Sequence, residues 1–214
     1  MKKICIVATV PFALNVFMRP HIIMLAEQYE VTLIANGTAL DVKSMLRENI
    51  RFVNLNISRK ISLWRDLISL IQLYKIFANE RFDVVHSITP KAALLSMVAA
   101  FIAVIPKRIH TFTGQVWVNN KGMRRWLLRV FDKLIAFCAT NLITDSFSQQ
   151  QFLIEQHVVK KDKIVVLGNG STCGVDVGRF KPDLEVRNQI RAELSIPESA
   201  IVYLYLGRLN KHKG

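Results

Sequence analysis

The sequence has 214 residues, of which 51% are hydrophobic, and a mean hydropathy of +0.25. This composition is sufficient for a packed core and excludes an intrinsically disordered chain. The formal net charge of +13 requires an anionic partner, which can be nucleic acid, a phosphate-bearing substrate or acidic lipid. The longest apolar segment, residues 92–105, is shorter than the about 18 residues of a membrane span, so it predicts a buried helix.

The N-terminus, MKKICIVATVPFALNV, has a lysine pair before an apolar run, as signal peptides do. The run is short, β-branched and broken by Pro11, so we interpret it as the first core strand. The three cysteines, Cys5, Cys138 and Cys173, match no disulfide or metal spacing. Their apolar or small neighbours predict reduced core thiols in a cytosolic protein.

Short β-branched runs alternate with helical patterns along the chain. The predicted strands cover residues 3–10, 30–35, 51–56, 83–87, 108–112, 141–144 and 163–167. The predicted helices cover residues 19–28, 41–49, 63–79, 91–104, 123–139 and 148–157. Several strands are nearly all apolar, which is typical of strands covered on both faces. The alternation predicts an α/β fold with a Rossmann-like, doubly wound parallel sheet.

The composition changes near Pro182, which we interpret as the end of a first domain at residues 1–182. A turn-rich segment precedes this point, and its glycines predict a linker with positive φ angles. A charged helix over residues 184–194 and a strand-like run, IVYLYL at residues 201–206, follow it. Residues 183–214 are therefore predicted to be a linker helix and the first strand of a second domain.

Ligands of parallel sheets bind at the carboxyl ends of the strands, so the loops after the strands hold the candidate site residues. The loop after the first strand lacks a Gly-x-Gly-x-x-Gly fingerprint. It offers instead Asn15, Arg19 and His21 among large apolar groups, a mixture that suits an amphiphilic ligand. The alternative is a helix entry with Pro20 near its first turn.

Two further loops carry polar candidates. His86 ends the fourth strand and Lys91 lies in the next helical turn, whose free N–H groups could hold an anion. A structural histidine is the alternative there. The loop after the fifth strand has the composition of a sugar-binding loop, with Thr113, Gly114, Gln115 and Trp117 following His110. Trp117 could stack on a sugar ring or pack in the core.

The last candidates follow the sixth strand and the strand-like run at residues 201–206. Ser146 ends the sixth strand, and Ser148 is predicted to cap the next helix. Gly207 would let the backbone approach a ligand closely. Arg208 and Lys213 supply two cations that could neutralise a diphosphate leaving group.

One helical pattern carries basic side chains on about half of its circumference: Lys121, Arg124, Arg125, Arg129 and Lys133. Trp126, Leu127, Val130, Phe131 and Leu134 occupy much of the other half and are predicted to pack on the sheet. The basic side would then meet an anionic membrane surface, or the helix is an ordinary surface helix. No nucleic-acid-binding signature is present, so nucleic acid is not a predicted partner.

Four motifs, TFTGQVWVNNKG, TDSFSQQQFL, VLGNGSTCGVDVGRF and LGRLNKHKG, occur in this order. Together they resemble bacterial family 4 glycosyltransferases of the GT-B architecture, especially those that extend lipid-linked sugars for capsule, O-antigen or glycoprotein glycans. The resemblance spans essentially the whole chain. It implies two Rossmann-like domains, of which the N-terminal one holds the acceptor and the C-terminal one holds the nucleotide sugar.

By this resemblance, residues 1–182 are the acceptor domain, and GRLNKHKG opens the donor domain, with Arg208 and Lys213 at the donor diphosphate. The family retains anomeric configuration and typically works without a bound metal. We expect a nucleotide sugar, UDP-linked, as co-substrate and no other cofactor. The expected acceptor is a polyprenyl-diphosphate-linked saccharide at the cytoplasmic face of the cell membrane.

Two departures from the family pattern affect these expectations. Many members have a histidine after the fifth strand, where this chain has Thr113 with His110 upstream, so neither is assigned as catalytic. The family's acidic pair and nucleotide pocket would lie beyond residue 214, so we expect the 214-residue chain alone to be inactive. A nucleotide-sugar epimerase of the same architecture and a non-catalytic module that binds anionic lipid or another polyanion are the alternatives.

Overall fold

The computed structural model of the chain describes residues 1–58 and 62–207. The chain forms two units, Met1–Gly174 and Val175–Gly214. The described part of the first unit contains one parallel sheet of seven strands. The strands are β1 (Lys3–Val7), β2 (Glu30–Ala35), β3 (Ile50–Asn54), β4 (Val84–Ser87), β5 (Lys107–Phe112), β6 (Asn141–Thr144) and β7 (Ile164–Val166).

Helical segments connect successive strands. They are α1 (Pro11–Ala13), the π-helical turn η1 (Leu14–Met18), α2 (Arg19–Leu25), the 3₁₀ turn η2 (Ala39–Val42), α3 (Leu63–Glu80), α4 (Pro90–Ile102), α5 (Gly122–Cys138), α6 (Phe147–Glu155) and the 3₁₀ turn η3 (Lys161–Lys163). The second unit contains α7 (Leu184–Glu193). The loop predicted after the first strand is therefore mostly helical.

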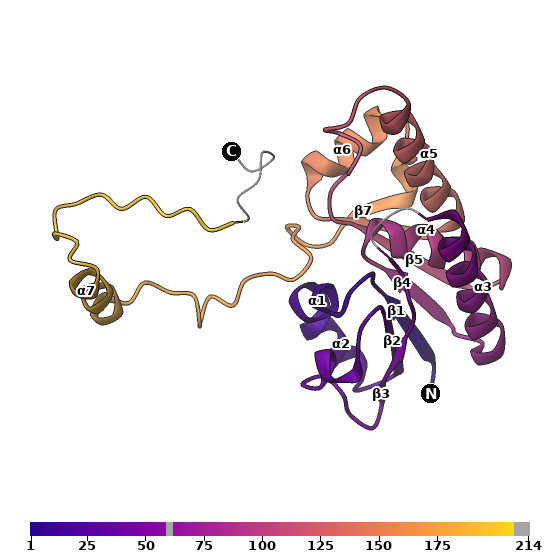
Figure 1. Cartoon of the computed structure of the whole chain (residues 1–214), viewed down its shortest axis with the longest axis horizontal. Helices are drawn as coiled ribbons and strands as arrows, with labels where there is room; N and C mark the ends of the chain where they lie inside the picture. Colours follow the sequence, from indigo (N-terminus) through magenta and orange to yellow (C-terminus); the bar gives the residue numbers. More distant parts are fainter. Residues whose placement is uncertain (59–61, 208–214) are drawn as a thin grey trace. The chain divides into compact units, whose positions relative to one another are not determined.

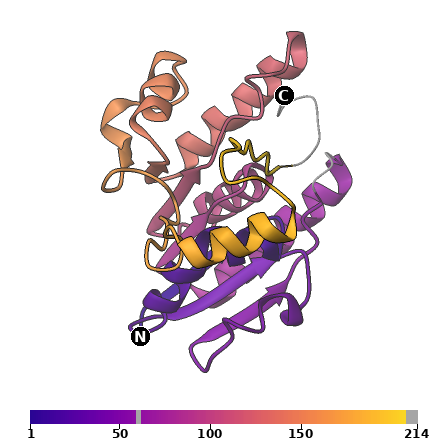
Figure 2. The ribbon, with the colours of Figure 1, turned by 90° about the vertical axis from the view of Figure 1, so that its left-hand side faces the viewer.

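The strand order is β3-β2-β1-β4-β5-β6-β7, so the direction of winding reverses between β1 and β4. Figure 2 shows β2 and β3 at one end of the sheet and β6 and β7 at the other. The segments that follow β1 and β4 are joined by a hydrogen bond of 2.8 Å from the backbone N–H of Thr9 to Oγ1 of Thr89. In open parallel sheets, ligands bind at the carboxyl edge near such a reversal.

A hydrophobic core lies on each face of the sheet, because successive strand residues point to opposite faces. On β1, Cys5 and Val7 belong to the core that contains α3 and α4, whereas Ile4 and Ile6 belong to the core that contains α2. Figure 1 shows α3, α4 and α5 on one side of the sheet and α1 and α2 on the other. The predicted doubly wound parallel sheet is confirmed.

One predicted helix, over residues 41–49, is wrong. The structure has only η2 and turns in this segment. The carbonyl oxygen of Asn49 already accepts a hydrogen bond of 2.8 Å from the backbone N–H of Val31 on β2. Residues 47–50 form a turn instead, in which the backbone N–H of Ile50 donates to the carbonyl oxygen of Arg47 at 3.0 Å, and this turn leads directly into β3.

The second unit confirms the predicted charged helix but not the strand. Asp183 caps α7, since its Oδ1 accepts hydrogen bonds from the backbone N–H groups of Glu185 at 3.0 Å and Val186 at 3.1 Å. Residues 201–206 form no strand, because no segment among residues 175–207 pairs with them. A strand needs a hydrogen-bonded neighbour, which local sequence preference cannot replace.

The long apolar segment at residues 92–105 lies mostly in α4, which confirms a buried helix. Seven residues of α4 are buried, among them Leu95, Met97 and Ala100. Among the described residues, no helix combines the length and the apolar character that crossing a bilayer requires.

Candidate functional site

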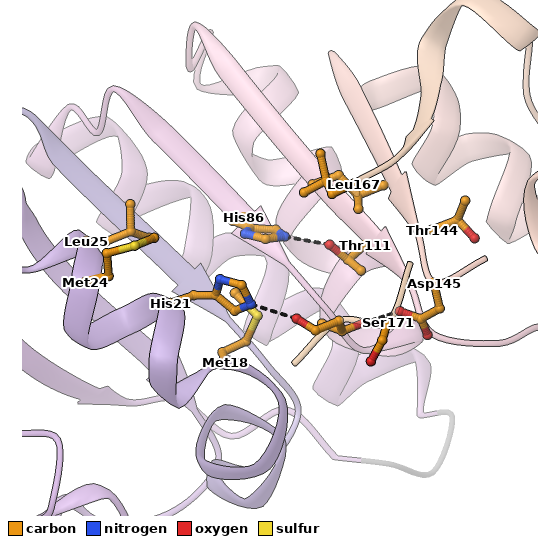
Figure 3. Close-up of a pocket in the computed structure, with 12 residues that line it drawn as sticks. Met18, His21, Met24, Leu25, His86, Thr111, Thr144, Asp145, Leu167 and Ser171 are labelled. Atoms are coloured by element: carbon orange, nitrogen blue, oxygen red, sulfur yellow. Dashed lines mark hydrogen bonds between the residues drawn. The ribbon is translucent and has the colours of Figure 1, made fainter. Parts of the chain in front are cut away.

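A pocket of about 190 Å³ lies at the carboxyl ends of β4, β5 and β6, next to α2 (Figure 3). Its polar lining comes from separate segments of the chain: His21, His86, Thr111, Thr144, Asp145, Ser171 and Thr172. Its apolar lining consists of Met18, Met24, Leu25, Ile143 and Leu167. Ligand pockets usually combine an apolar wall with a few polar groups that orient the ligand, so this pocket is the candidate site.

The strand register explains which side chains reach the pocket. His86 on β4 pairs with Ile109 on β5, so Thr111, two residues further along, points to the same face as His86. The Nε2 atom of His86 lies 2.8 Å from Oγ1 of Thr111, a hydrogen bond drawn in Figure 3. Burial, together with the nearby His21, lowers the pKa of His86 to about 4. His86 is therefore neutral at physiological pH.

A second hydrogen-bonded chain joins α2 to the loop after β7. Nε2 of His21 lies 2.6 Å from the carbonyl oxygen of Thr172, and Oγ1 of Thr172 donates to Oδ1 of Asp145. Figure 3 shows these side chains around one part of the pocket. Oδ2 of Asp145 has no hydrogen-bond partner among the described residues.

The glycine-rich loop after β7 is folded against the end of β6. The backbone N–H of Ser171 donates to the carbonyl oxygen of Asp145 at 2.7 Å. Gly170 has φ of +92°, and a Cβ atom there would lie 2.3 Å from the same oxygen. The predicted positive φ angles are confirmed at Gly168, Gly170 and Gly174. The loop does more than connect domains, since it forms a wall of the pocket.

His110, a candidate for the catalytic residue, lies outside the pocket. It is 2% exposed and points to the opposite face of the sheet, where its Nδ1 is 3.0 Å from both Oγ and the carbonyl oxygen of Ser87. Burial lowers the pKa of His110 to about 3. Thr113, the other candidate, is exposed, and its hydroxyl donates to the carbonyl oxygen of Ile88 at 3.4 Å. Neither residue contacts a group in the pocket lining.

Three predicted acceptor residues near helix starts have different surroundings. The Nδ2 atom of Asn15 donates to the carbonyl oxygen of Asp41 at 2.7 Å, which ties η1 to η2. Nζ of Lys91 forms an ion pair of 2.7 Å with Asp66 on α3. Arg19 is exposed at the start of α2. Lys91 thus links α3 and α4 in this structure.

Trp117 packs in the core, which was one of its two predicted alternatives. The side chain is 1% exposed, stacks on Phe152 with 5.4 Å between ring centroids, and donates from Nε1 to Asp132 at 2.7 Å. Arg125 and Arg129 lie over the same ring at 5.7 and 6.0 Å. Burial raises the pKa of Asp132 to about 6, although the Trp117 hydrogen bond lowers it. The indole is therefore not available to stack on a sugar.

The predicted residues around the start of α6 form a hydrogen-bonded group. Ser146, not Ser148, caps the helix, since its Oγ accepts from the backbone N–H of Gln149 at 3.2 Å. The side-chain amide of Gln149 donates to Oε1 of Gln115 at 3.4 Å. Gly114 is exposed with φ of +126°. These residues orient the loop after β5 beside the end of β6.

Of the donor-diphosphate candidates, Gly207 is exposed in the second unit. Arg208 and Lys213 lie outside the described residues.

Cys5 and Cys138 are buried as predicted, but Cys173 is exposed, because the loop after β7 turns it away from the core. No group of His, Cys, Asp or Glu in the described chain could hold a metal ion.

The prediction for the apolar side of α5 is wrong. Of the five predicted residues, Trp126, Leu127, Val130 and Leu134 are exposed and Phe131 is half-buried. Met123 and Phe137 of the same helix are exposed as well. The helix buries instead Asp132, Ile135, Ala136 and Cys138. Lys121, Arg124, Arg125 and Lys133 are exposed as expected, whereas Arg129 is half-buried and donates to the carbonyl oxygen of Gln156. A different face of α5 therefore packs against α4 and β5.

Sequence reasoning missed much of the pocket, including Thr111, Asp145, Thr172 and the methionines of its wall. The positions of Asp145 and Thr111 at the ends of predicted parallel strands could have indicated them as site residues. Thr172 had none, because its loop lies far along the chain from α2.

The fold is a doubly wound α/β unit that is similar to one half of known two-domain structures. The structure of Anabaena HepE in complex with UDP-glucose superposes with a TM-score of 0.65 and 15% identity, covering 91% of this chain and 50% of HepE. A likeness at this identity describes the fold alone.

Sequence comparisons identify the family. The model of the glycosyl transferase 4-like domain matches residues 23–170. The capsular polysaccharide biosynthesis glycosyltransferase CapM of Staphylococcus aureus is 36% identical over 157 residues, 73% of this chain and 40% of CapM. The UDP-Gal:α-D-GlcNAc-diphosphoundecaprenol α-1,3-galactosyltransferase of Escherichia coli is 30% identical over 187 residues, 86% of this chain and 46% of the enzyme. The chain belongs to the glycosyl transferase 4-like family, and it spans less than half the length of these two relatives.

Proposed function

We propose that residues 1–174 bind the acceptor of a glycosyltransferase that adds a sugar to a polyprenyl-diphosphate-linked saccharide. The carrying observation is the pocket at the carboxyl ends of β4–β6, where hydroxyl, imidazole and carboxylate groups lie beside methionine and leucine side chains. Sugar hydroxyls need the first kind of group, and an isoprenoid chain or a sugar ring face packs on the second. The Escherichia coli relative is named for such an undecaprenol-diphosphate acceptor.

Asp145, Thr111 and His21 are the residues that we expect to contact the acceptor saccharide. The free oxygen of Asp145 would accept a hydrogen bond from a sugar hydroxyl. Thr111 and His21 would complete a polar rim whose geometry is already held by His86 and Thr172. A site that pairs with specific hydroxyls discriminates strongly against sugars that lack them.

We expect the donor to be a UDP-linked hexose or N-acetylhexosamine, transferred with retention of anomeric configuration by the whole transferase. A similar fold carries UDP-glucose in HepE, and the galactosyltransferase relative is named for UDP-Gal. In the transfer, an acceptor hydroxyl oxygen bonds to the anomeric carbon as the bond to the diphosphate breaks, and the hydroxyl proton leaves with the departing phosphate oxygen. Both curated relatives are transferases, which favours transfer over epimerisation.

The proposed acceptor also places the protein at the cytoplasmic face of the membrane, as a peripheral protein. A polyprenyl chain stays in the bilayer while its saccharide enters the pocket. The exposed cations of α5 are suited to the anionic lipid of that surface.

The proposal is tested by titrating the 214-residue chain with detergent-solubilised undecaprenyl-diphosphate-N-acetylglucosamine. We expect saturable binding that undecaprenyl phosphate without a sugar does not reproduce. Asp145→Asn should weaken it by about tenfold, because one hydrogen bond to a charged group is worth about 1.5–3 kcal/mol.

The matched control is Glu27→Gln, which makes the same acid-to-amide change at an exposed residue beyond the end of α2. It should leave the affinity unchanged. Equal binding of the sugar-free lipid, or equal effects of the two substitutions, would show that the pocket does not bind the saccharide specifically.

A further inference from the structure

The outer surface of the helical layer α3–α4–α5 is apolar over all three helices. In a globular unit, the outer side of such a layer is normally polar, with the apolar stripe turned to the sheet. Here each helix has a second apolar stripe on the side away from the core. Exposed apolar areas of this extent mark interaction sites.

On α3, the core-facing residues include Ser69, Leu73 and Phe77. A separate stripe at helical spacing is exposed: Leu63, Trp64, Leu67, Ile68, Ile71 and Tyr74. Trp64 is 79% exposed, although tryptophan is among the most costly side chains to leave in water. Packing within the described unit does not account for this stripe.

On α5, the exposed stripe lies at positions i, i+3, i+4, i+7, i+11 and i+14 from Met123, and Trp126 within it is 60% exposed. Arg124 and Lys133 are exposed and flank this stripe on its two sides at helical spacing, whereas Arg125 and Arg129 lie over the Trp117 ring. Asp132, the one acidic residue in the sequence of α5, is buried. The water-facing side of α5 is thus apolar and cationic.

The helix α4 packs between α3 and α5 and continues the apolar surface. Leu94 and Val98 of α4 are partly buried against the core, and Phe101 and Ile102 near its C-terminal end are exposed. Phe101 contacts Phe137 of α5, with 5.7 Å between ring centroids. The two exposed stripes are therefore joined by α4 into one surface, which we call the α3–α5 face.

We propose that the α3–α5 face lies on an anionic lipid bilayer, with α3 inserting as deeply as α5. The charge of the face favours a lipid bilayer over a second copy of the chain as its partner. In a symmetric dimer, the exposed cations of α5 would face their own copies or apolar residues, with no exposed carboxylate on α5 to pair with them. Phosphate groups of anionic lipid supply that missing charge, while the acyl region accepts the isoleucines and leucines.

The positions of the two exposed tryptophans relate this face to the pocket. Trp64 lies in the first turn of α3 and Trp126 in the second turn of α5. Each of these helices begins near the carboxyl edge of the sheet, because it follows a parallel strand and returns to the opposite edge. Tryptophan prefers the interface between lipid and water. Trp64 and Trp126 would then anchor the edge of the sheet that carries the pocket at the membrane surface.

This inference deepens the proposed function, since a polyprenyl-linked acceptor resides in a bilayer, but it is tested without any saccharide. The chain has three tryptophans, and the third, Trp117, is buried. Trp126→Phe leaves Trp64 as the exposed reporter, and Trp64→Phe leaves Trp126. The fluorescence of each variant is measured with vesicles containing phosphatidylglycerol, with and without bromine atoms on the acyl chains.

We expect a blue shift and bromine quenching in both variants. The double variant Trp64→Phe/Trp126→Phe should show neither, because Trp117 is in the core. Quenching in the variant that reports Trp126 but not in the variant that reports Trp64 would remove α3 from the face. Absence of quenching in both would overturn the membrane assignment, and binding of acceptor in detergent would still test the proposed function separately.

The affinity of the chain for vesicles tests the apolar and the electrostatic contributions to membrane binding. Ile68→Gln/Ile71→Gln should weaken binding about tenfold by removing apolar area from α3. Arg124→Gln/Lys133→Gln should weaken it about thirtyfold at low salt, from about 1 kcal/mol for each cation near the surface. Leu40→Gln and Lys43→Gln, exposed near η2 on the other side of the sheet, are the matched controls and should change nothing. Equal affinity for phosphatidylcholine vesicles, or equal losses in the controls, would contradict the proposal.

Discussion

His21 and Thr172 are 151 residues apart in the sequence, yet Nε2 of the histidine lies 2.6 Å from the threonine carbonyl oxygen. This contact joins α2, near the start of the chain, to the glycine-rich loop after the last strand. It closes one wall of the pocket in which Asp145 also holds the hydroxyl of Thr172. The site is thus assembled from both ends of the first unit.

Replacing His21 should loosen the loop more than it destabilises the fold. His21→Ala removes one hydrogen bond, which contributes about 0.5–1.5 kcal/mol to the free energy of unfolding. We expect faster hydrogen exchange at Ser171 and Thr172, with exchange in the central strands unchanged. His21→Gln, whose amide can reach the same carbonyl oxygen, should restore part of the protection. Unchanged exchange in the alanine variant would show that the contact does not order the loop.

Gly170→Ala should be strongly destabilising. The added Cβ would lie 2.3 Å from the carbonyl oxygen of Asp145, and the φ of +92° is strained for any other residue. Gly174→Ala is the matched control, because its φ of +64° is also positive but no atom lies within 4 Å of the new Cβ. Urea unfolding should show a loss of about 1 kcal/mol for the control and several times more for Gly170→Ala. Similar losses would mean that the close approach relaxes freely.

The neutral state of His86 should make the fold sensitive to acid. Its pKa is about 4 in the folded chain against 6.5 ordinarily, so the unfolded chain binds more protons between these values. The free energy of unfolding should therefore fall as pH decreases from about 6.5 to about 4. Urea unfolding at neutral pH and at about pH 5 measures this slope, which His86→Gln should reduce. An unchanged slope would assign the acid sensitivity to other groups, of which His110 is the first to test.

Asp132 should have the opposite effect on pH dependence. Its pKa is raised from 3.8 to about 6, so the folded chain binds more protons than the unfolded chain between these values. Stability from this group is lost as pH rises through that window. Asp132→Asn keeps an acceptor for the Trp117 indole and should be more stable than the native chain above about pH 6. Asp132→Ala leaves the indole N–H unpaired and should cost about 1–3 kcal/mol. Equal stability of the two variants would contradict this account.

Residue patterns alone were sufficient for the parallel sheet, most element bounds and the family. The run of β1 is apolar after Lys3 because both faces of the strand are covered, and this property is local to the strand. The same locality explains the failures. The segment at residues 41–49 has helical character, but the turn closed by Arg47 and Ile50 and the pairing of β3 with β2 decide its conformation. The segment at residues 201–206 has strand character but no partner among residues 175–207.

The sequence by itself determined that α5 is amphipathic and basic, but only the tertiary structure decided which side meets the sheet. Helical periodicity gives the spacing of apolar residues and not the direction of the core, so two apolar stripes on one helix cannot be ranked from their pattern. Trp117 and His110 were ambiguous for the same reason, since burial depends on neighbours distant in the chain. The pocket itself is a contact between β4, β5, β6, α2 and a loop after β7, and long-range contacts of this kind exist only once the chain has folded.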